Sequence, residues 1–221
     1  MAKEKNSTLD GKPTGWYLPE AAHPYYALAQ KYDIDFAAPA GPNPPLDPVS
    51  EKNYTDDQSA GFLQDKTVQD KLANAKTLDK VDTDEYIALF YPGGSGPVLD
   101  LAFDLKNAEI ATKFYRSGRL VSAVCHGPAA LVKVTDEAGK SIFAGKEATA
   151  FSDAEEAALD GLKSVPFYIE DEIQKLGGHY KKAKEIFESC VVISGKLITG
   201  QNPASSKGVG EEILRALTAT T

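Results

Sequence analysis

Short apolar runs alternate with stretches of helical periodicity along the chain. The run at residues 85–91 is nearly continuous, which is typical of a strand that is buried on both faces. Ser194-Gly195 separates the last two runs and predicts a hairpin turn between them. The pattern predicts strands at residues 33–38, 85–91, 120–124, 190–193 and 196–199.

Two other stretches carry apolar side chains at helical spacing. Residues 105–115 predict a helix, and Gly118 supplies its usual C-terminal stop. Residues 208–217 predict a closing helix with one apolar stripe. Because strands alternate with helices, we expect a single α/β domain over residues 1–221, with a parallel sheet covered by helices on both faces. The long polar stretch at residues 41–82 predicts a helical insertion or cap within that domain.

The composition narrows the class of protein. The 221 residues include 24 Lys+Arg and 32 Asp+Glu, so the net charge of −8 argues against a nucleic-acid partner, which needs a basic surface. No apolar run is long enough for a membrane span, and residues 1–7 lack the apolar centre of a signal peptide. The two cysteines form no disulfide framework. We therefore expect a soluble protein of a reducing compartment, most simply the cytoplasm, with the nucleus as a second location.

The most informative segment is the turn after the third predicted strand. The strand ends at Cys125, and His126, Gly127 and Pro128 follow, with Pro128 suited to the first turn of a helix. Such a strand-to-helix turn lifts a nucleophile above the sheet edge and points helix N-terminal amides at it. Those amides can bind an oxyanion and favour a thiolate, so we expect a thiol pKa below its ordinary value. Alternatively, Cys125 is a buried small apolar residue, as free cysteines usually are; the His-Gly-Pro sequence favours the nucleophile.

Three further positions are candidates by residue type and surroundings. Glu20 is the only acid in residues 11–22, and a carboxyl shielded there has a raised pKa and can share a proton with a thiol. A carboxylate at a helix N-terminus is an equal alternative. Gly93-Gly94 allow a ligand to approach the backbone, although a glycine-rich turn after a strand is more often only a turn. Glu156 lies among other acids, so a solvated acidic face is its alternative.

The sequence contains no evident motif for a metal or a nucleotide. The three histidines, His23, His126 and His179, lack the spacing of metal ligands. Neither a Walker loop nor a dinucleotide-binding glycine motif follows a predicted strand. We therefore expect a protein that uses no cofactor. Trp16 and Tyr17 are candidates either for lining a pocket or for packing near its mouth.

A set of segments carries a family resemblance, and the most specific of them reads AVCHGPAAL. The segments are residues 11–24, 91–97, 123–131, 151–156, 166–172 and 198–205. Together they resemble the ThiJ/PfpI superfamily, most closely its fungal glutathione-independent glyoxalases (glyoxalase III, or D-lactate dehydratase), which double as stress-inducible chaperones. The resemblance runs from about residue 9 to residue 217. It implies a flavodoxin-like parallel sheet between helices, as in class I glutamine amidotransferases.

The resemblance also implies roles for the candidate side chains. Cys125 is implied to be the nucleophile, with His126 as its general acid/base neighbour. Glu20 is implied to be the carboxylate that approaches the thiol, and Glu156 to orient the histidine as the third member of a triad.

The substrate oxyanion has an implied place as well. The resemblance assigns it to Gly93 and Gly94 together with the backbone N–H of His126. Ser95 stands where many relatives carry a histidine, so we expect different substrate contacts at that point.

The N-terminus departs from the family pattern. Members open with an apolar β-strand, and residues 1–10 contain no such run. In a 2-1-3-4-5 sheet this strand is central, so its absence leaves backbone groups of the neighbouring strands without partners. We therefore expect a flavodoxin-like sheet whose first strand is missing.

The reaction implied by the resemblance is the rearrangement of a small 2-oxoaldehyde, such as methylglyoxal, to D-lactate. The Cys125 thiolate adds to the aldehyde to form a hemithioacetal, and Glu20 or His126 moves a proton through an enediol. The resulting thioester then hydrolyses. Neither glutathione nor a metal is needed, because the enzyme supplies the sulfur itself. A homodimer is implied in the same way.

Two other functions remain open from the sequence. One is a different enzyme, which repairs glycated adducts or hydrolyses a substrate with the Cys–His–Glu set. The other is a holdase chaperone or redox sensor, in which Cys125 is oxidised without turnover. Loss of D-lactate formation in Cys125→Ala favours the glyoxalase, whereas suppression of client aggregation that survives this substitution favours the chaperone.

Overall fold

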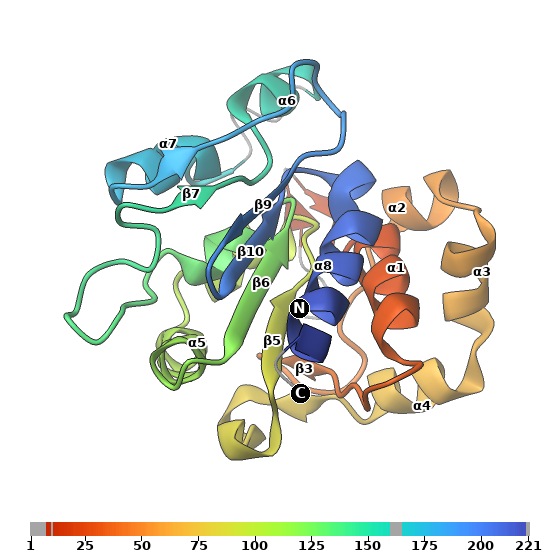
Figure 1. Cartoon of the computed structure of the whole chain (residues 1–221). Helices are drawn as coiled ribbons and strands as arrows, with labels where there is room; N and C mark the ends of the chain where they lie inside the picture. The colour runs from red at the N-terminus through yellow and green to blue at the C-terminus, as the bar shows by residue number, and fades with distance from the viewer. Residues whose placement is uncertain (1–7, 10, 160–164, 220–221) are drawn as a thin grey trace.

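The centre of the fold is a four-stranded sheet (Figure 1). The computed structural model describes residues 8–9, 11–159 and 165–219. The strands lie in the order β5 (Ala88–Tyr91), β6 (Leu120–Val124), β10 (Leu197–Gly200) and β9 (Val191–Ser194). β5, β6 and β10 run parallel, and β9 is antiparallel to β10.

Helices cover both faces of this sheet. α1 (Leu18–Leu28) and α8 (Ser206–Ala219) lie on one face, and α5 (Leu105–Arg116) lies on the other (Figure 1). Successive side chains of a strand point to opposite faces. Val121 of β6 therefore belongs to the apolar cluster of α5, and Val124 to that of α8. The result is the α/β fold with a mostly parallel, helix-covered sheet that the sequence predicts.

Three short helices form within the polar stretch at residues 41–82. They are α2 (Pro48–Asn53), α3 (Asp57–Gln64) and α4 (Lys66–Ala73), and they lie beside α1 (Figure 1). Each begins after an aspartate whose side chain accepts hydrogen bonds from backbone N–H groups of the first turn, which stabilises a helix that is otherwise too short. These aspartates are Asp47, Asp56 and Asp65. That the stretch is a cap within one domain remains a prediction.

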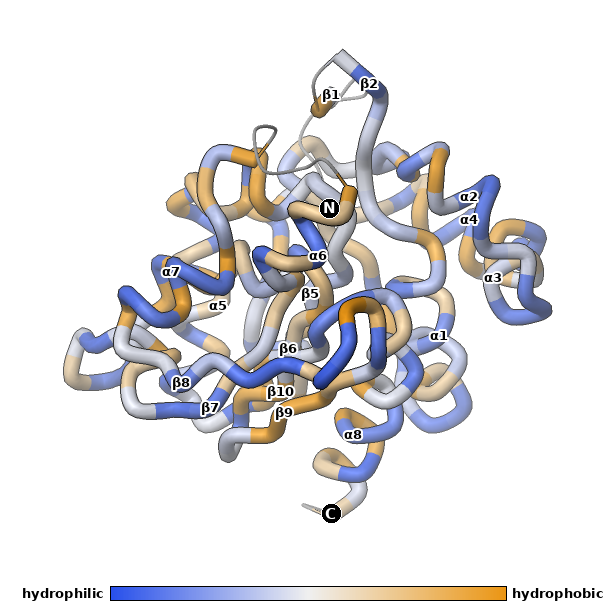
Figure 2. The backbone as a smooth tube through the Cα atoms, turned by 90° about the horizontal axis from the view of Figure 1, so that it is seen from above, coloured by the Kyte–Doolittle hydropathy of each residue, from blue (hydrophilic) through white to orange (hydrophobic). Residues whose placement is uncertain are grey.

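The remaining elements are short. They are β1 (Thr8–Leu9), β2 (Lys12–Pro13), β3 (Ala37–Ala38), β4 (Lys76–Thr77), β7 (Glu147–Ala148), β8 (His179–Tyr180), α6 (Asp153–Ala158) and α7 (Ile169–Lys175). β3 pairs with β4 and β7 with β8, both in parallel. β1 and β2 form an antiparallel ribbon that lies apart from the central sheet (Figure 2).

The structure confirms the predicted helices and the hairpin. α5 and α8 correspond to the helices predicted at residues 105–115 and 208–217. β9 and β10 are joined by Gly195-Lys196, one residue later than predicted, and Gly195 has the positive φ (+64°) that a two-residue hairpin turn needs. Among the described residues, no helix is long and apolar enough to cross a membrane.

Two predicted strands differ from expectation. Of residues 33–38, only the last two form a strand, β3. The run at residues 85–91 begins with a 3₁₀ turn at Thr83–Glu85, and its strand, β5, is largely half-buried rather than buried on both faces. The reason is that β5 is an edge strand: no described strand lies on its second side. The missing first strand was predicted for residues 1–10, of which residues 1–7 and 10 lie outside the described residues, so it stays a prediction.

Candidate active site

Cys125 occupies a strained turn at the end of β6. Its φ is +58°, in the left-handed region that residues with a side chain rarely adopt. The turn is fixed on both sides, because Cys125 N–H donates to the Gly200 carbonyl (2.9 Å) and Phe151 N–H donates to the Cys125 carbonyl (2.9 Å). A 3₁₀ turn, Gly127–Leu131, follows at once. The predicted strand–cysteine–helical turn geometry is therefore present.

Glu20 lies in the first turn of α1 and is fully buried, with 0% of its surface exposed. Gly93 N–H donates to its Oε2 (2.7 Å). Burial raises the pKa of Glu20 to about 8, although hydrogen bonds from the Cys125 thiol and from Gly93 N–H act in the opposite direction. At neutral pH, most of this carboxyl is therefore protonated.

The environment of the thiol differs from the sequence-based expectation. Cys125 is 4% exposed, and burial raises its pKa well above the ordinary value. Glu20 raises it further, whereas a hydrogen bond from the backbone N–H of His126 lowers it. The expectation of a lowered thiol pKa was wrong, because it counted the helix amides but neither the burial nor the facing carboxyl. At neutral pH, the site therefore holds a thiol rather than a free thiolate.

His126 connects the thiol to a second carboxylate. Its Nδ1 lies 3.4 Å from Cys125 Sγ, and its Nε2 lies 2.5 Å from Glu156 Oε1. The ring stacks on Phe151 at a centroid distance of 4.6 Å. Glu156 is buried, which excludes the solvated acidic face that the sequence left open for it. Two contacts and one aromatic face therefore fix the imidazole beside the sulfur.

Gly93 is the point where these groups meet. A Cβ added there would lie 2.6 Å from Glu20 Oε2, 2.7 Å from His126 N and 2.9 Å from Cys125 Cβ. No side chain fits at such distances. Gly94 is constrained as well, since its φ is +76° and an added Cβ would lie 2.1 Å from the Gly15 carbonyl oxygen. Gly93 brings backbone next to Cys125, although its N–H is already used by Glu20.

Two tyrosines complete the surroundings of the thiol, and the sequence signalled only one of them. The rings of Tyr17 and Tyr54 meet edge to face at 5.5 Å. Burial, and then the proximity of Tyr54, Cys125 and Glu20, raises the pKa of Tyr17. Tyr54 follows α2 in the polar stretch, where one aromatic among charged residues was its only signal. Trp16 instead packs in the core, where its ring contacts Phe62 (5.9 Å).

The remaining cysteine and histidine candidates lie elsewhere. His23 Nε2 lies 3.1 Å from Asp56 Oδ1 in a partly exposed ion pair, and His179 is exposed in β8. Cys190 is half-buried just before β9. Within residues 8–9, 11–159 and 165–219, no group of three or more His, Cys, Asp or Glu side chains is arranged to hold a metal ion.

We expect Glu156→Gln to slow the alkylation of Cys125 by iodoacetamide about tenfold at pH 7.5. The amide cannot stabilise a positive charge on His126 as a carboxylate does, so the imidazole becomes a weaker base toward the thiol. The rate of loss of free thiol measures this, read at Cys125 by peptide mass spectrometry. Glu109→Gln on the exposed side of α5 is the matched control. An unchanged rate in Glu156→Gln would contradict the assigned role.

Proteins of similar sequence and structure are known. The chain matches the DJ-1/PfpI family over residues 20–216. The glutathione-independent glyoxalase of Saccharomyces cerevisiae is 30% identical over 217 residues, covering 94% of this chain and 91% of the yeast protein. The Rapid Encystment Protein of 24 kDa from Francisella tularensis superposes with a TM-score of 0.89 at 32% identity, over 98% of this chain and 95% of that structure. Glyoxalase III from Candida albicans superposes with a TM-score of 0.85 at 28% identity, over 96% and 92%.

Proposed function

This chain belongs to the DJ-1/PfpI family, and from that premise we propose that it is a glutathione-independent glyoxalase that converts methylglyoxal to D-lactate. One observation carries the proposal. A buried thiol, Cys125, lies beside the fully buried Glu20 and 3.4 Å from an imidazole held by Glu156. Relatives of about 30% identity that carry the glyoxalase name support the same reaction class.

The first step joins the sulfur to the substrate. Cys125 Sγ attacks the aldehyde carbon, and the π electrons of the carbonyl move to its oxygen. The backbone N–H groups of Gly94 and His126 stabilise that oxyanion. His126 Nδ1 takes the thiol proton, and the proton of Glu20 passes to the oxygen, which gives a neutral hemithioacetal. A low-exposure site favours this step, because a small carbonyl carries no charge that must be desolvated.

The second step moves hydrogen from the first carbon to the second. Glu20, now a carboxylate, removes the proton from the former aldehyde carbon, and His126 protonates the second oxygen, so that an enediol forms. The same proton returns to the neighbouring carbon, and His126 takes the hydroxyl proton from the first carbon's oxygen, so the product is a thioester of lactate and the step is an isomerisation. Water then hydrolyses the thioester, which releases D-lactate and returns the proton to the thiol. Glu156 keeps the imidazole oriented throughout, through its contact with Nε2.

The test is D-lactate formation by the purified protein in methylglyoxal without glutathione. We expect D-lactate, and no L-lactate, when the product is read with stereospecific lactate dehydrogenases. Dialysis against a chelator should leave the rate unchanged, which excludes a contaminating metal-dependent glyoxalase. If D-lactate appears only after glutathione is added, or does not appear at all, the proposal is wrong.

A further inference from the structure

Glu155 is a buried acid in the first turn of α6 that the proposed reaction does not use. None of its surface is exposed (0%). Its Oε2 accepts hydrogen bonds from Ser152 N–H (2.9 Å), from the Ser152 hydroxyl (2.7 Å) and from Gln201 Nε2 (3.0 Å). Its Oε1 accepts hydrogen bonds from Phe187 N–H (2.9 Å) and from Asn202 Nδ2 (2.7 Å). We call these five residues the carboxylate anchor.

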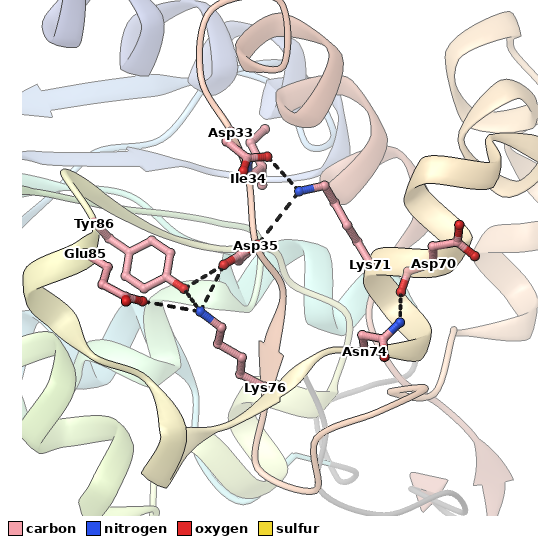
Figure 3. Close-up of polar contacts among 9 residues, drawn as sticks. All are labelled: Asp33, Ile34, Asp35, Asp70, Lys71, Asn74, Lys76, Glu85 and Tyr86. Atoms are coloured by element: carbon pink, nitrogen blue, oxygen red, sulfur yellow. Dashed lines mark hydrogen bonds and ion pairs between the residues drawn. The ribbon is translucent and has the colours of Figure 1, made fainter.

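The hydrogen bonds of Glu155 indicate that it is a buried anion. Both of its oxygens face donors, so a proton on either one would point at another hydrogen. The ion pairs in Figure 3 are a contrast, because Asp33 Oδ1 lies 2.7 Å from Lys71 Nζ. In the same cluster, Asp35 Oδ2 lies 3.1 Å from Lys76 Nζ. Each donor to Glu155 is instead a neutral amide or hydroxyl, and together these donors replace the water that an exposed carboxylate would bind.

The carboxylate anchor fixes α6 against the end of β10. Gln201 and Asn202 directly follow β10 and are 1% and 0% exposed. The last residue of β10, Gly200, accepts the hydrogen bond from Cys125 N–H through its carbonyl. The strand end that fixes the turn of the thiol therefore also fixes α6.

This attachment controls the contact between α6 and the imidazole. Glu156 is the next residue of the same helical turn, and its Oε1 lies 2.5 Å from His126 Nε2. A hydrogen bond to a carboxylate weakens steeply when its length or angle departs from the optimum. Because Glu155 and Glu156 share one turn of α6, a shift of this turn away from β10 would lengthen the contact with His126.

The carboxylate anchor also fixes the aromatic side chains beside the imidazole. Phe187 has a φ of +63°, a conformation that a residue with a side chain keeps only when its surroundings hold it there. Its N–H is one of the donors to Glu155. Its ring lies 6.3 Å from the ring of Phe151, which in turn stacks on His126 at 4.6 Å. Glu155 therefore holds the outer member of this stack.

A role limited to helix capping does not account for the carboxylate anchor. Ser152 and Glu155 form a capping box, which needs only these two residues. The other three donors, Phe187, Gln201 and Asn202, lie 32, 46 and 47 positions farther along the chain. Their convergence on one carboxylate joins three segments around the imidazole.

We propose that Glu155 is a positioning residue for His126. It sets the contact between Glu156 and the imidazole, and it fixes the ring stack on the face of the imidazole. Glu155 takes no part in proton transfer and acts through its neighbours. The inference rests on the proposed function, in which His126 moves protons. If Glu155 were only a cap of α6, its loss would lower stability and leave the state of the imidazole unchanged.

The first test reads the imidazole directly, without substrate. Long-range proton–nitrogen NMR distinguishes the tautomers of the three histidines through their carbon-bound ring protons. We expect His126 to carry its proton on Nε2, which faces a carboxylate, and Glu156→Gln to change the signals of this ring alone and so identify them. Glu155→Gln keeps the shape but turns one acceptor oxygen into a donor, so it should give a mixture of tautomers.

The matched control for this test is Asp104→Asn. It weakens the N-terminal cap of α5, away from His126, and should leave the tautomer unchanged. The proposal is overturned if Glu155→Gln leaves the signals of His126 as they are in the unaltered protein. It is overturned equally if the unaltered protein already contains a mixture of tautomers.

A milder variant decides the matter if Glu155→Gln fails to fold. Gln201→Met keeps the charge of Glu155 and removes one donor to its Oε2. Alkylation of Cys125 by iodoacetamide should slow about threefold in Gln201→Met, and this substitution should add nothing further to the effect of Glu156→Gln, because it acts through that contact. An unchanged rate in Gln201→Met, or effects of the two substitutions that multiply, would contradict the proposal.

These measurements are separate from the test of the proposed function. Neither the tautomer of His126 nor the alkylation of Cys125 requires methylglyoxal. If the unaltered protein forms no D-lactate, the proposed reaction is wrong, and the two measurements still decide whether Glu155 positions the imidazole.

Discussion

The Cys125→Ala variant should form D-lactate at least about 10³-fold more slowly than the unaltered protein. The proposed reaction needs a carbon–sulfur bond before any proton can move, and no other thiol lies at the site. The second cysteine, Cys190, is half-buried just before β9. Cys190→Ala is therefore the matched control, and it should retain the full rate. Initial rates at saturating methylglyoxal, without glutathione, measure both.

A Cys125→Ala variant of unchanged rate would remove the thiol from the mechanism and leave the glyoxalase proposal without its nucleophile. The same variant also separates the alternatives that the sequence left open. If unaltered protein forms no D-lactate, and both proteins suppress aggregation of a heated client equally, a holdase without turnover accounts for the chain. Thermal unfolding of the variant must be recorded alongside, so that loss of structure is not read as loss of chemistry.

Glu20→Gln should lower the rate of D-lactate formation by about 10²–10⁴-fold. The amide has nearly the same shape, and it can still accept the hydrogen bond from Gly93 N–H. It cannot exchange a proton with the thiol, so both the addition step and the enediol step lose their acid/base partner. Initial rates at several pH values measure the effect. A rate within threefold of the unaltered protein would assign the proton transfers to His126 alone.

The same substitution should have the opposite effect on stability. The pKa of Glu20 is about 8 in the folded chain, and its ordinary value is 4.5. Folding therefore favours the neutral carboxyl, and its contribution is fully present below pH 4.5 and is lost as the pH rises through 8. We expect the free energy of unfolding to fall by up to about 5 kcal/mol across this window, and Glu20→Gln to lack that fall.

Urea unfolding of the two proteins at pH 5 and at pH 8.5 checks this expectation. The difference in stability between them should be small at the lower pH and should favour Glu20→Gln at the higher one. The exposed Glu109→Gln should follow the unaltered protein at both. Parallel curves for Glu20→Gln and the unaltered protein would show that the buried carboxyl does not titrate in this range.

Local sequence was sufficient for the thiol and its turn. An apolar run followed at once by Cys-His-Gly-Pro specifies a strand, a bend and a helical turn within a dozen residues, and the structure has all three. Glu20 is different, because its contact with Gly93 joins residues 73 positions apart. Without the family resemblance, a buried carboxyl at this position could not be distinguished from an exposed carboxylate at a helix N-terminus. Nothing in the sequence marked Tyr54 as a site residue, because its position near the thiol depends on how the polar stretch at residues 41–82 folds.

The predictions from sequence that were wrong have one physical cause in common. Apolar content correctly marks a segment as suited to a strand, but a ladder needs a partner. Residues 33–36 and the outer edge of β5 have none among the described strands. The thiol pKa failed for a related reason. Amides of the adjacent turn are local, whereas the burial and the carboxyl that outweigh them come from α1, far away in the chain. Interactions between residues close in sequence were predicted correctly, whereas those between residues far apart in sequence were not.

At position 125, backbone conformation favours glycine, whereas the proposed chemistry requires cysteine. At a φ of +58°, a glycine would relieve the backbone, because it has no Cβ to crowd the neighbouring carbonyl. A library randomised at this codon and sorted only for heat resistance should therefore accumulate glycine and lose its active members. Directed evolution of a more robust catalyst would have to keep the cysteine fixed and search elsewhere.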